Sequence, residues 1–569
     1  MDKLQRPRLG GHLLVQCLIA QGVTHVFGVP GESFLAVLDG FYDAGDAIRF
    51  VVNRQEGGAA FMAEAYGKLT GRAGVCIVTR GPGATNASIG VHTAFQDSTP
   101  MVLLVGDVAA DTRDREAFQA LDYSHFFGPG TGGMAKRVER IDDVRRIPEA
   151  VARAFATAHN GRPGPVVLVL PEDILNQALP GDAPAPLPAQ PEVQAEIGPH
   201  GIHRLREALL NSERPMLLVG GPGWTPQAAQ ALQDFAQAWQ LPVTNAFRFQ
   251  DTFDNHHPNY AGDVGLGLNP ALARRLQDAD LIVALGVRLG EITTGGYTWL
   301  QAPRPRQRLV HVHPGADELN RVYQADLALC AGVASVAPAL AALPAPTNPP
   351  WRDWTAAAHA DYLASLQPQP LPGAVDMAAV VACIQRLLPA DAVLTNGAGN
   401  FASWLHRFFR YPGRARGGRT QLAPTNGAMG YGVPAGIAAA LTTGRTVLTL
   451  TGDGDFLMTG QELATAVQHG AKTIVVLINN GLYGTIRMHQ ARTYPGRISG
   501  TQLRNPDFCA LAQSYGYASA RVQRTAEFEP ALQAALARPE GTLIEIMLDP
   551  ECITTRASLR QIENPPTHG

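Results

Sequence analysis

Two short motifs in the last third of the sequence offer oxygen ligands of the kind that a hard divalent cation prefers. Gly452-Asp453-Gly454 and Asn479-Asn480 each follow an apolar run. Proteins commonly bind Mg²⁺ through one or two carboxylates together with the phosphate oxygens of a ligand. Asp453 and Asn480, with a nearby backbone carbonyl, would therefore suit a magnesium–diphosphate pair. Gly452 and Gly454 would let the backbone approach the phosphates closely.

The spacing of the two motifs adds to their specificity. A lone Gly-Asp-Gly is common where a strand turns into a helix, and its simpler explanation is a plain turn with capping residues. Here residues 455–478 separate it from the second motif. This spacing resembles the fingerprint of thiamine-diphosphate enzymes. The resemblance implies that Asp453 and Asn480 bind Mg²⁺, with the backbone carbonyl of Leu482 as the third protein ligand.

A glutamate in the first part of the chain could activate such a cofactor. Glu56 lies in the run 53–67, which precedes Gly81-Pro82-Gly83. This region is similar to the pyrimidine-binding domain of acetohydroxyacid (acetolactate) synthases, where a glutamate at this point hydrogen-bonds the pyrimidine ring. The resemblance implies that Glu56 promotes removal of a proton from the thiazolium carbon, and burial would favour proton sharing by raising its pKa. The alternative role is stabilisation of a helix N-terminus.

The same resemblance extends over nearly the whole chain and implies further site residues. Met429 stands where the family has a bulky apolar residue that keeps the cofactor bent, although core packing is the alternative. Gln119 matches a glutamine that lies near the thiazolium. Gly399 and Asn400 stand where the family contacts the diphosphate, with different side chains.

Two departures from the family bear on the substrate. Ile292 replaces an arginine that pairs with the substrate carboxylate, and an aliphatic side chain cannot make that bidentate contact. His489 replaces a tryptophan that shapes the acceptor pocket, so we expect His489 to shape it here. Three reactions stay open: acetolactate-synthase-like decarboxylation and carboligation of 2-oxo acids, simple decarboxylation, and C–C cleavage of a 2-hydroxy carbonyl compound. The presence of Glu56, Asp453 and Asn480 argues against a non-catalytic binding subunit.

A second cofactor, FAD, is left open by the middle of the chain. Biosynthetic relatives bind FAD in their middle domain without redox use. The glycines of 220–223 and Arg288 partly fit such a site, but His311 and His313 stand where an acidic residue often holds the nucleotide. FAD binding and its absence are both compatible with this pattern.

These residues need a scaffold that gathers the ends of several strands. Apolar runs such as 75–79, 281–286 and 447–451 are followed by a glycine and then a helical pattern, which is typical of parallel strands with crossover helices. Ligands bind such sheets at the carboxyl ends of the strands. Proline-rich stretches at about 179–199 and 343–372 indicate linkers.

The expected fold class is therefore α/β, with three doubly wound parallel-sheet domains. Residues 1–178 would form the pyrimidine-binding domain and residues 200–342 a Rossmann-like middle domain. Residues 373–569 would form the domain that binds the diphosphate and Mg²⁺. The family resemblance implies a homodimer or homotetramer with active sites at the subunit interface.

Composition limits the partners and the location. The 46 basic and 49 acidic residues leave a net charge of -3, which does not resemble the clustered charge of a nucleic-acid-binding surface. Five arginines between 407 and 419 are interrupted by aromatic residues and glycines, which favours a solvated loop or a subunit contact. We expect a small carbonyl compound, such as a 2-oxo acid, as the partner.

The six cysteines are scattered without a CxxC pair, so neither a zinc site nor a disulfide framework is indicated. Residues 1–10 do not resemble a secretory signal, and no apolar run approaches the roughly 20 residues of a membrane span. These patterns favour a cytoplasmic location without membrane contact.

Overall fold

The structure, a computed structural model, describes residues 7–128 and 133–564, and its named strands form three six-stranded sheets. The chain divides into two compact units. The first unit holds one sheet and consists of Met1–Val193, Val433–Thr443 and Thr459–Ala471. The second unit holds the other two sheets and consists of Gln194–Gly432, Gly444–Met458 and Lys472–Gly569. The expectation of three parallel α/β sheets is confirmed.

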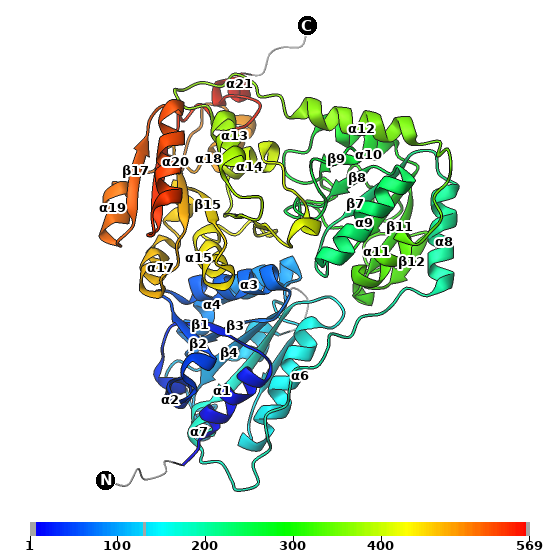
Figure 1. Ribbon diagram of the computed structural model, residues 1–569. Coiled ribbons are helices and arrows are strands. Elements are labelled where there is room, and N and C mark those ends of the chain that lie inside the picture. Colours follow the sequence, from blue (N-terminus) through cyan, green and yellow to red (C-terminus); the bar gives the residue numbers. More distant parts are fainter. Residues whose placement is uncertain (1–6, 129–132, 565–569) are drawn as a thin grey trace. The chain divides into compact units, whose positions relative to one another are not determined.

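The first sheet is parallel throughout, with strand order β2-β1-β3-β4-β6-β5 (Figure 1). Its strands are β1 His25–Gly28, β2 Arg49–Val52, β3 Gly74–Val78, β4 Met101–Asp107, β5 Arg137–Arg140 and β6 Pro165–Pro171. The helices of this region are α1 Gly10–Ala20, α2 Leu35–Ala44, α3 Glu56–Thr70, α4 Gly81–Asp97, α5 Tyr123–Phe127, α6 Ile147–His159 and α7 Glu172–Asn176. Alternate strand residues such as Val75 and Ile77 point into a core with α1, α2 and α6, as the period of two in a strand requires.

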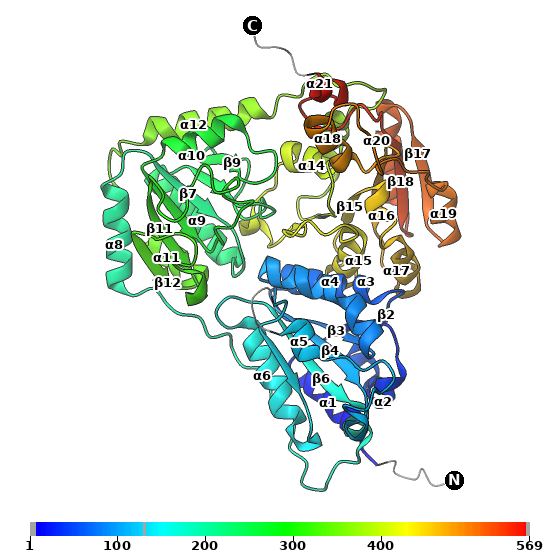
Figure 2. The ribbon, with the colours of Figure 1, turned by 180° about the vertical axis from the view of Figure 1, so that it is seen from behind.

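The second sheet is also parallel, with strand order β12-β11-β10-β7-β8-β9 (Figure 2). Its strands are β7 Pro215–Val219, β8 Val243–Asn245, β9 Tyr260–Asp263, β10 Leu281–Leu285, β11 Arg308–His313 and β12 Leu327–Cys330. Its helices are α8 Pro199–Leu210, α9 Pro226–Trp239, α10 Pro270–Asp278, α11 Val333–Ala341 and α12 Arg352–Ser365. Helices α8, α9 and α11 share one core with the sheet, and α10 and α12 contribute to the other.

Helix α12 corrects one expectation from the sequence. The proline-rich stretch at 343–372 indicated a linker, but Arg352–Ser365 within it forms a helix. Trp351 and Tyr362 are buried in one of the two cores of the second sheet. The prolines flank the helix and do not interrupt it. The proline content of the whole stretch therefore indicated a linker, although the residues between the prolines form an apolar helix face.

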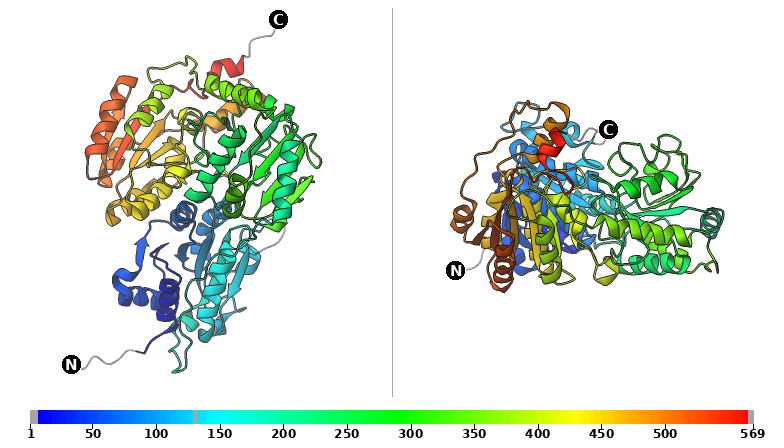
Figure 3. Two further views of the ribbon diagram at one scale, coloured as in Figure 1. Left: turned by 45° about the vertical axis from the view of Figure 1, so that its right-hand side comes forward. Right: turned by 90° about the horizontal axis from the view of Figure 1, so that it is seen from above.

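The third sheet is parallel, with strand order β14-β13-β15-β16-β18-β17, and further views are given in Figure 3. Its strands are β13 Val393–Asn396, β14 Gln421–Leu422, β15 Val447–Gly452, β16 Ile474–Asn479, β17 Ala518–Val522 and β18 Thr542–Met547. The helices of this part of the chain are α13 Met377–Leu387, α14 Ala402–Phe408, α15 Gly432–Thr443, α16 Asp453–Phe456, α17 Leu463–His469, α18 Gly484–Thr493, α19 Phe508–Ser514, α20 Phe528–Ala537 and α21 Leu559–Glu563. Helices α13, α14 and α20 pack on one face of the sheet.

The strand order of the third sheet creates a crevice for a ligand. The chain runs from β13 outward to β14 and then returns to the other side of β13 to form β15. The connections that leave β13 and β15 therefore diverge to opposite sides at the carboxyl ends of these strands. Open α/β sheets bind their ligands at such a switch point.

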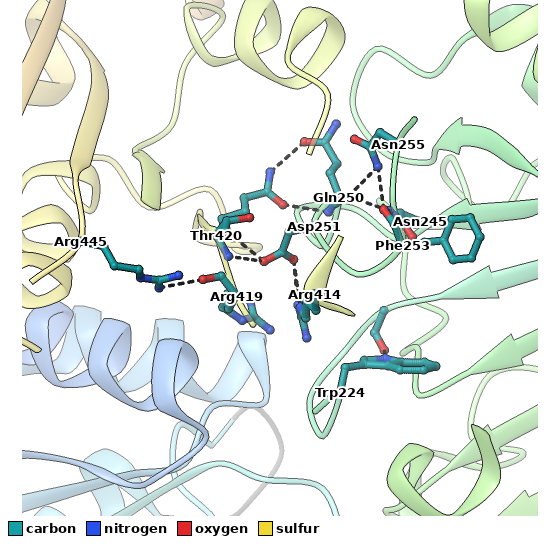
Figure 4. A network of polar contacts seen from close by, with 12 residues as sticks. Trp224, Asn245, Gln250, Asp251, Phe253, Asn255, Arg414, Arg419, Thr420 and Arg445 are labelled. Atoms are coloured by element: carbon teal, nitrogen blue, oxygen red, sulfur yellow. Dashed lines mark hydrogen bonds and ion pairs between the residues drawn. The ribbon is translucent and has the colours of Figure 1, made fainter. Parts of the chain in front are cut away.

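A buried ion pair joins the second and third sheets within the second unit (Figure 4). Asp251, which follows β8, places its Oδ1 2.9 Å from Nη2 of Arg414. Its Oδ2 accepts the backbone N–H groups of Thr420 at 2.9 Å and Gln421 at 3.1 Å. Burial alone would raise the pKa of Asp251, but the charges of Arg414 and Arg419 hold it below the ordinary value.

This network corrects the interpretation of the basic run at 407–419. Arg414 is 2% exposed and Arg419 is 8% exposed. The expectation of a solvated loop is therefore wrong for these two arginines. Asp251, which pairs with Arg414, lies far away in the sequence, so the run itself carried no sign of the pairing.

Two further expectations can be compared with the structure. Among the residues described, there is no helix with both the length and the apolar character needed to cross a membrane. All six cysteines fall in the described ranges and all are free thiols.

Candidate active site

A cavity of about 650 Å³ lies in the second unit, at the switch point of the third sheet. Segments that follow β13, β15 and β16 contribute to its wall, together with residues that follow β8 and β9 of the second sheet. Many of the residues singled out in the sequence line this one cavity: Gly399, Asn400, Met429, Gly452, Asp453, Gly454, Asn480, Leu482 and His489.

Asp453 is the first residue of α16 and is only 3% exposed. Its Oδ1 accepts the backbone N–H of Gly454 at 2.9 Å. Its Oδ2 accepts the N–H of Gly481 and the amide of Asn505, both at 2.8 Å. Burial raises the pKa of Asp453, and these hydrogen bonds act in the opposite direction. The carboxylate is thus fixed in place and partly desolvated, which is a setting that a cation would stabilise.

The other oxygen donors fit a magnesium ion by their chemistry. Asn480 directly follows β16, and its Oδ1 accepts the backbone N–H of Leu482 at 3.1 Å, which fixes the orientation of the amide. A carboxylate, an amide oxygen and a backbone carbonyl are the hard oxygen ligands that Mg²⁺ prefers. Asp453, Asn480 and Leu482 line the same cavity, so the donor set fits the ion.

The glycines of the first motif are needed for packing as well as for access. A Cβ atom on Gly452 would lie 2.7 Å from the ring of Phe401. A Cβ atom on Gly454 would lie 2.5 Å from the ring of Tyr483. Two aromatic rings therefore pack directly on this backbone. Any larger residue would displace the turn that carries Asp453.

Asn400 uses its side chain for contacts within the protein. Its Nδ2 donates to the carbonyl of Ile553 at 3.0 Å, and its Oδ1 accepts the Thr485 hydroxyl at 3.0 Å. Its backbone N–H donates to the same hydroxyl at 3.0 Å. Asn400 therefore ties the loop after β13 to the start of α18. Gly399, beside it, has no room for a Cβ atom, which would lie 2.6 Å from the Phe401 ring.

Met429 is partly buried at the cavity wall, in a segment of unusual backbone conformation. Gly427 and Gly430 have φ values of 71° and 81°, which favour glycine. Asn426 Oδ1 accepts the N–H of Ala428 at 3.2 Å, forming a turn before the methionine. These contacts hold Met429 at the edge of the cavity and not in the core of the sheet.

Asp455 is a site residue that the motif spacing did not reveal. Its Oδ1 accepts the N–H groups of Ala398 at 3.1 Å and Gly430 at 2.8 Å, and its Oδ2 accepts the Thr451 hydroxyl at 2.7 Å. Burial raises the pKa of Asp455 to about 6. The side chain thus connects the loop after β13 to the segment that carries Met429. A second acidic residue beside Gly-Asp-Gly was its only sign in the sequence.

Glu56 belongs to the first unit, where it is the first residue of α3. Its Oε2 accepts the amide of Asn86 at 2.9 Å. Gln55 caps the helix by accepting the N–H of Gly58 at 3.0 Å. A glutamate in the first turn also suits the helix dipole, so the structural role weighed for Glu56 is compatible with this position.

Glu462 fixes the start of α3 and was not identified from the sequence. It is fully buried and accepts the N–H groups of Arg54 at 3.1 Å and Gln55 at 3.0 Å, and the amide of Asn53 at 3.1 Å. Burial raises its pKa. These residues are distant in the chain but lie in the same unit, so only the folded arrangement reveals that Glu462 helps to position Glu56.

Gln119 also belongs to the first unit and adopts a left-handed conformation with φ 63°. Its carbonyl accepts the N–H of Gly81 at 2.9 Å, at the start of α4. A non-glycine residue in this conformation is uncommon and is often found at functional sites. Gln119 is therefore fixed beside the glycine-rich turn that begins α4.

The two departures from the family pattern are placed differently. His489 is exposed on α18 and lines the cavity. Ile292 lies in the turns after β10 and is not among the residues that line the cavity. Ile292 therefore provides no contact for a substrate carboxylate in this cavity.

The residues weighed for an FAD site lie at the end of the second sheet and make contacts within the protein. A Cβ atom on Gly221 would lie 2.0 Å from the carbonyl oxygen of Gly286, so the two backbones already meet there. Trp224 donates its indole N–H to the carbonyl of Gly220 at 2.8 Å. His311 is buried, with Nε2 2.9 Å from the carbonyl of Val287. The glycine at position 221 thus lets the segments after β7 and β10 meet closely.

Three family models match successive parts of the chain. The N-terminal TPP binding domain of thiamine pyrophosphate enzymes matches residues 8–126, the central domain matches residues 202–340, and the C-terminal TPP binding domain matches residues 397–546. The cavity described above lies partly within the last of these matches.

Curated relatives cover nearly the full length. The acetolactate synthase isozyme 2 large subunit of Escherichia coli (strain K12) is 32% identical over 550 residues, which is 95% of each chain. The acetolactate synthase large subunit of Corynebacterium glutamicum is 32% identical over 92% of this chain and 84% of its own. A probable acetolactate synthase large subunit of Methanocaldococcus jannaschii is 30% identical over 95% of this chain and 92% of its own. The chain is therefore a thiamine-diphosphate-dependent enzyme and belongs to the thiamine pyrophosphate enzyme family, with acetolactate synthase large subunits as its relatives.

Proposed function

We propose that this enzyme decarboxylates a 2-oxo acid and joins the product to a second carbonyl compound, in the manner of an acetolactate synthase, with thiamine diphosphate and Mg²⁺. The observation that carries the proposal is a single cavity, at the switch point of the third sheet, that is lined by Asp453, Asn480 and Met429. The family relationship supports the same reaction class.

In this proposal the second unit holds the diphosphate end of the cofactor. The oxygens of Asp453 and Asn480 and the carbonyl of Leu482 bind Mg²⁺. The backbone at Gly399, Gly452 and Gly454 contacts the diphosphate, and Asn400 acts by fixing the loop that carries Gly399. Met429 supports the bent cofactor, and His489 shapes the wall of the pocket.

When bound, thiamine diphosphate supplies the nucleophilic carbon and the electron sink that decarboxylation requires. Glu56 would share a proton with the pyrimidine ring and so favour the form of the cofactor that can accept a proton. Gln119 orients the substrate by hydrogen bonding. FAD has no step in this mechanism.

The proposal requires at least a homodimer. Glu56 and Gln119 lie in the first unit, whereas Asp453 and Asn480 lie in the second. In the family, these parts of opposite subunits close around one cofactor. We therefore expect a dimer or tetramer in solution, and a stable active monomer would contradict this arrangement.

A second reaction is favoured by one observation. Ile292 cannot bind a carboxylate, so a simple decarboxylation or a cleavage of a 2-hydroxy carbonyl compound on the same scaffold is the alternative. Product analysis after separate incubations with 2-oxo acids and with 2-hydroxy carbonyl compounds separates the reactions. A 2-hydroxy ketone or acid supports carboligation, and free aldehyde alone supports the alternative. No turnover of any 2-oxo acid would contradict the proposed function.

A further inference from the structure

Arginines border the cavity at positions other than 292. Arg248 follows β8, Arg492 lies near the end of α18, and Arg556 lies just before α21. All three line the cavity. The resemblance to the family implies one arginine that binds the substrate carboxylate. The contacts of these three arginines show which of them is available for that role.

The guanidinium of Arg248 already makes contacts within the protein. It is 4% exposed, its guanidinium donates to the carbonyl of Pro424, and it lies 4.9 Å from the ring centroid of Phe247. Its charge also acts on Asp455, whose oxygens accept three hydrogen bonds from the protein. Arg248 therefore stabilises the wall of the cavity.

Arg556 has much weaker contacts. Its guanidinium reaches the carbonyls of Gly267 and Leu268 at 3.3 Å and 3.4 Å. Within residues 7–128 and 133–564, no carboxylate forms an ion pair with it. Arg556 is exposed, so a ligand can reach its guanidinium, although the protein atoms around it lower its pKa.

The backbone around Arg556 is well fixed. The Thr554 hydroxyl accepts the N–H of Arg556 at 3.2 Å and donates to the carbonyl of Ala557 at 2.7 Å. Ile553 on one side and Ser558 on the other are buried. The arginine thus projects from a rigid turn, which lowers the entropy cost of using it to bind a ligand.

Arg492 adds a second cation to the same cavity. His489 and Arg492 are three residues apart on α18 and therefore share one face of the helix. Arg492 is exposed, and in the described part of the chain no acidic side chain forms an ion pair with it. The cavity wall thus carries positive charge on two elements.

We propose that Arg556 is the residue that binds the substrate carboxylate, in place of the arginine that Ile292 replaces, with Arg492 contributing a second positive charge. A guanidinium matches a carboxylate through two parallel hydrogen bonds, which gives both affinity and orientation. This inference rests on the proposed function, because it names the group that recognises the 2-oxo acid. It makes Arg556 a specificity-determining residue that selects substrates bearing a carboxylate.

The test measures binding of oxamate, an unreactive analogue of pyruvate, to the holoenzyme by calorimetry. Arg556→Gln should weaken oxamate binding by about 10- to 100-fold, because a charge-assisted bidentate contact is lost. The affinity of Arg556→Lys for oxamate should lie between those of the wild type and Arg556→Gln, since lysine keeps the charge but cannot form two parallel hydrogen bonds. Arg560→Gln, an exposed arginine in the same segment that does not line the cavity, is the matched control and should bind oxamate like the wild type.

Binding of thiamine diphosphate and Mg²⁺ is measured in parallel and should be unchanged in all variants. If Arg556→Gln binds oxamate like the wild type, or if it loses cofactor binding to the same extent, the inference is overturned. If Arg556→Gln does not fold, Arg556→Lys must still bind oxamate more weakly than the wild type.

The two proposals can fail separately. Turnover of pyruvate with oxamate affinity that does not depend on Arg556 would overturn the inference and leave the proposed function standing. Oxamate binding that depends on Arg556, without turnover of any 2-oxo acid, would contradict the proposed function and support the carboxylate site.

Discussion

Asp251 and Arg414 form an ion pair with side chains that are 0% and 3% exposed, and they join two sheets of the second unit. Replacing Asp251 with Ala leaves the charge of Arg414 buried without its partner. We expect the free energy of unfolding to fall by about 3–5 kcal/mol. Urea unfolding followed by fluorescence measures the change. Asp317→Ala, at an exposed position, is the control, and an equal loss in both variants would refute a special role for the ion pair.

Glu56 should control turnover without controlling the fold. Glu56→Gln keeps the size of the side chain but cannot exchange a proton with the cofactor. We expect turnover to fall by about 100-fold or more, as for the loss of other acid–base groups. Turnover and cofactor affinity are measured on the same preparation. Unchanged turnover would refute the activating role, and a loss of cofactor binding alone would indicate a structural one.

Asp453 should control metal-dependent cofactor binding. Asp453→Asn removes a negative charge but keeps one oxygen acceptor for the N–H groups around it. We expect the affinity for thiamine diphosphate in the presence of Mg²⁺ to fall by at least about 10-fold, because the hard anionic ligand is lost. Asp391→Asn, an exposed change of the same kind, is the control. Equal affinity in both variants would argue against the proposed metal site.

His406 should lower the free energy of unfolding of the enzyme at acidic pH. Burial and the charge of Arg248 lower the pKa of His406 from 6.5 to about 3. Between these values the unfolded chain binds a proton that the folded chain excludes, so the free energy of unfolding falls as the pH falls below about 6.5. The contribution is at most about 1.4 kcal/mol per pH unit.

The measurement for His406 is urea unfolding of the apoenzyme at several pH values. His406→Gln should have a shallower dependence on pH than the wild type. His200→Gln, at an exposed position on α8, should follow the wild type. Identical slopes for the wild type and His406→Gln would show that His406 does not contribute.

The sheets could be predicted where their strands are apolar. The runs at 75–79, 281–286 and 447–451 correspond to β3, β10 and β15. Strand β5 could not be predicted, because three of its residues, Arg137, Glu139 and Arg140, are charged. The two-residue strand β14 is too short for any periodicity, and it is held by contacts with Asp251. The expected domain boundaries stay predictions.

The candidate site could be predicted where its residues follow one another in a motif. Asp453 and Asn480 stand at strand ends, and parallel strands bring their ends together, so their shared cavity follows from local pattern. Glu462 and Arg556 carry no local signal. Each acts on residues that are distant in the sequence, so only the folded chain reveals them.

The most direct test is incubation of the purified enzyme with pyruvate, thiamine diphosphate and Mg²⁺, with pyruvate consumption and acetolactate formation followed together. The proposed function predicts that acetolactate accumulates as pyruvate is consumed, and that omitting the cofactor or the metal abolishes both. Pyruvate that stays untouched while the cofactor binds would contradict the synthase activity and would direct the search to a different carbonyl substrate.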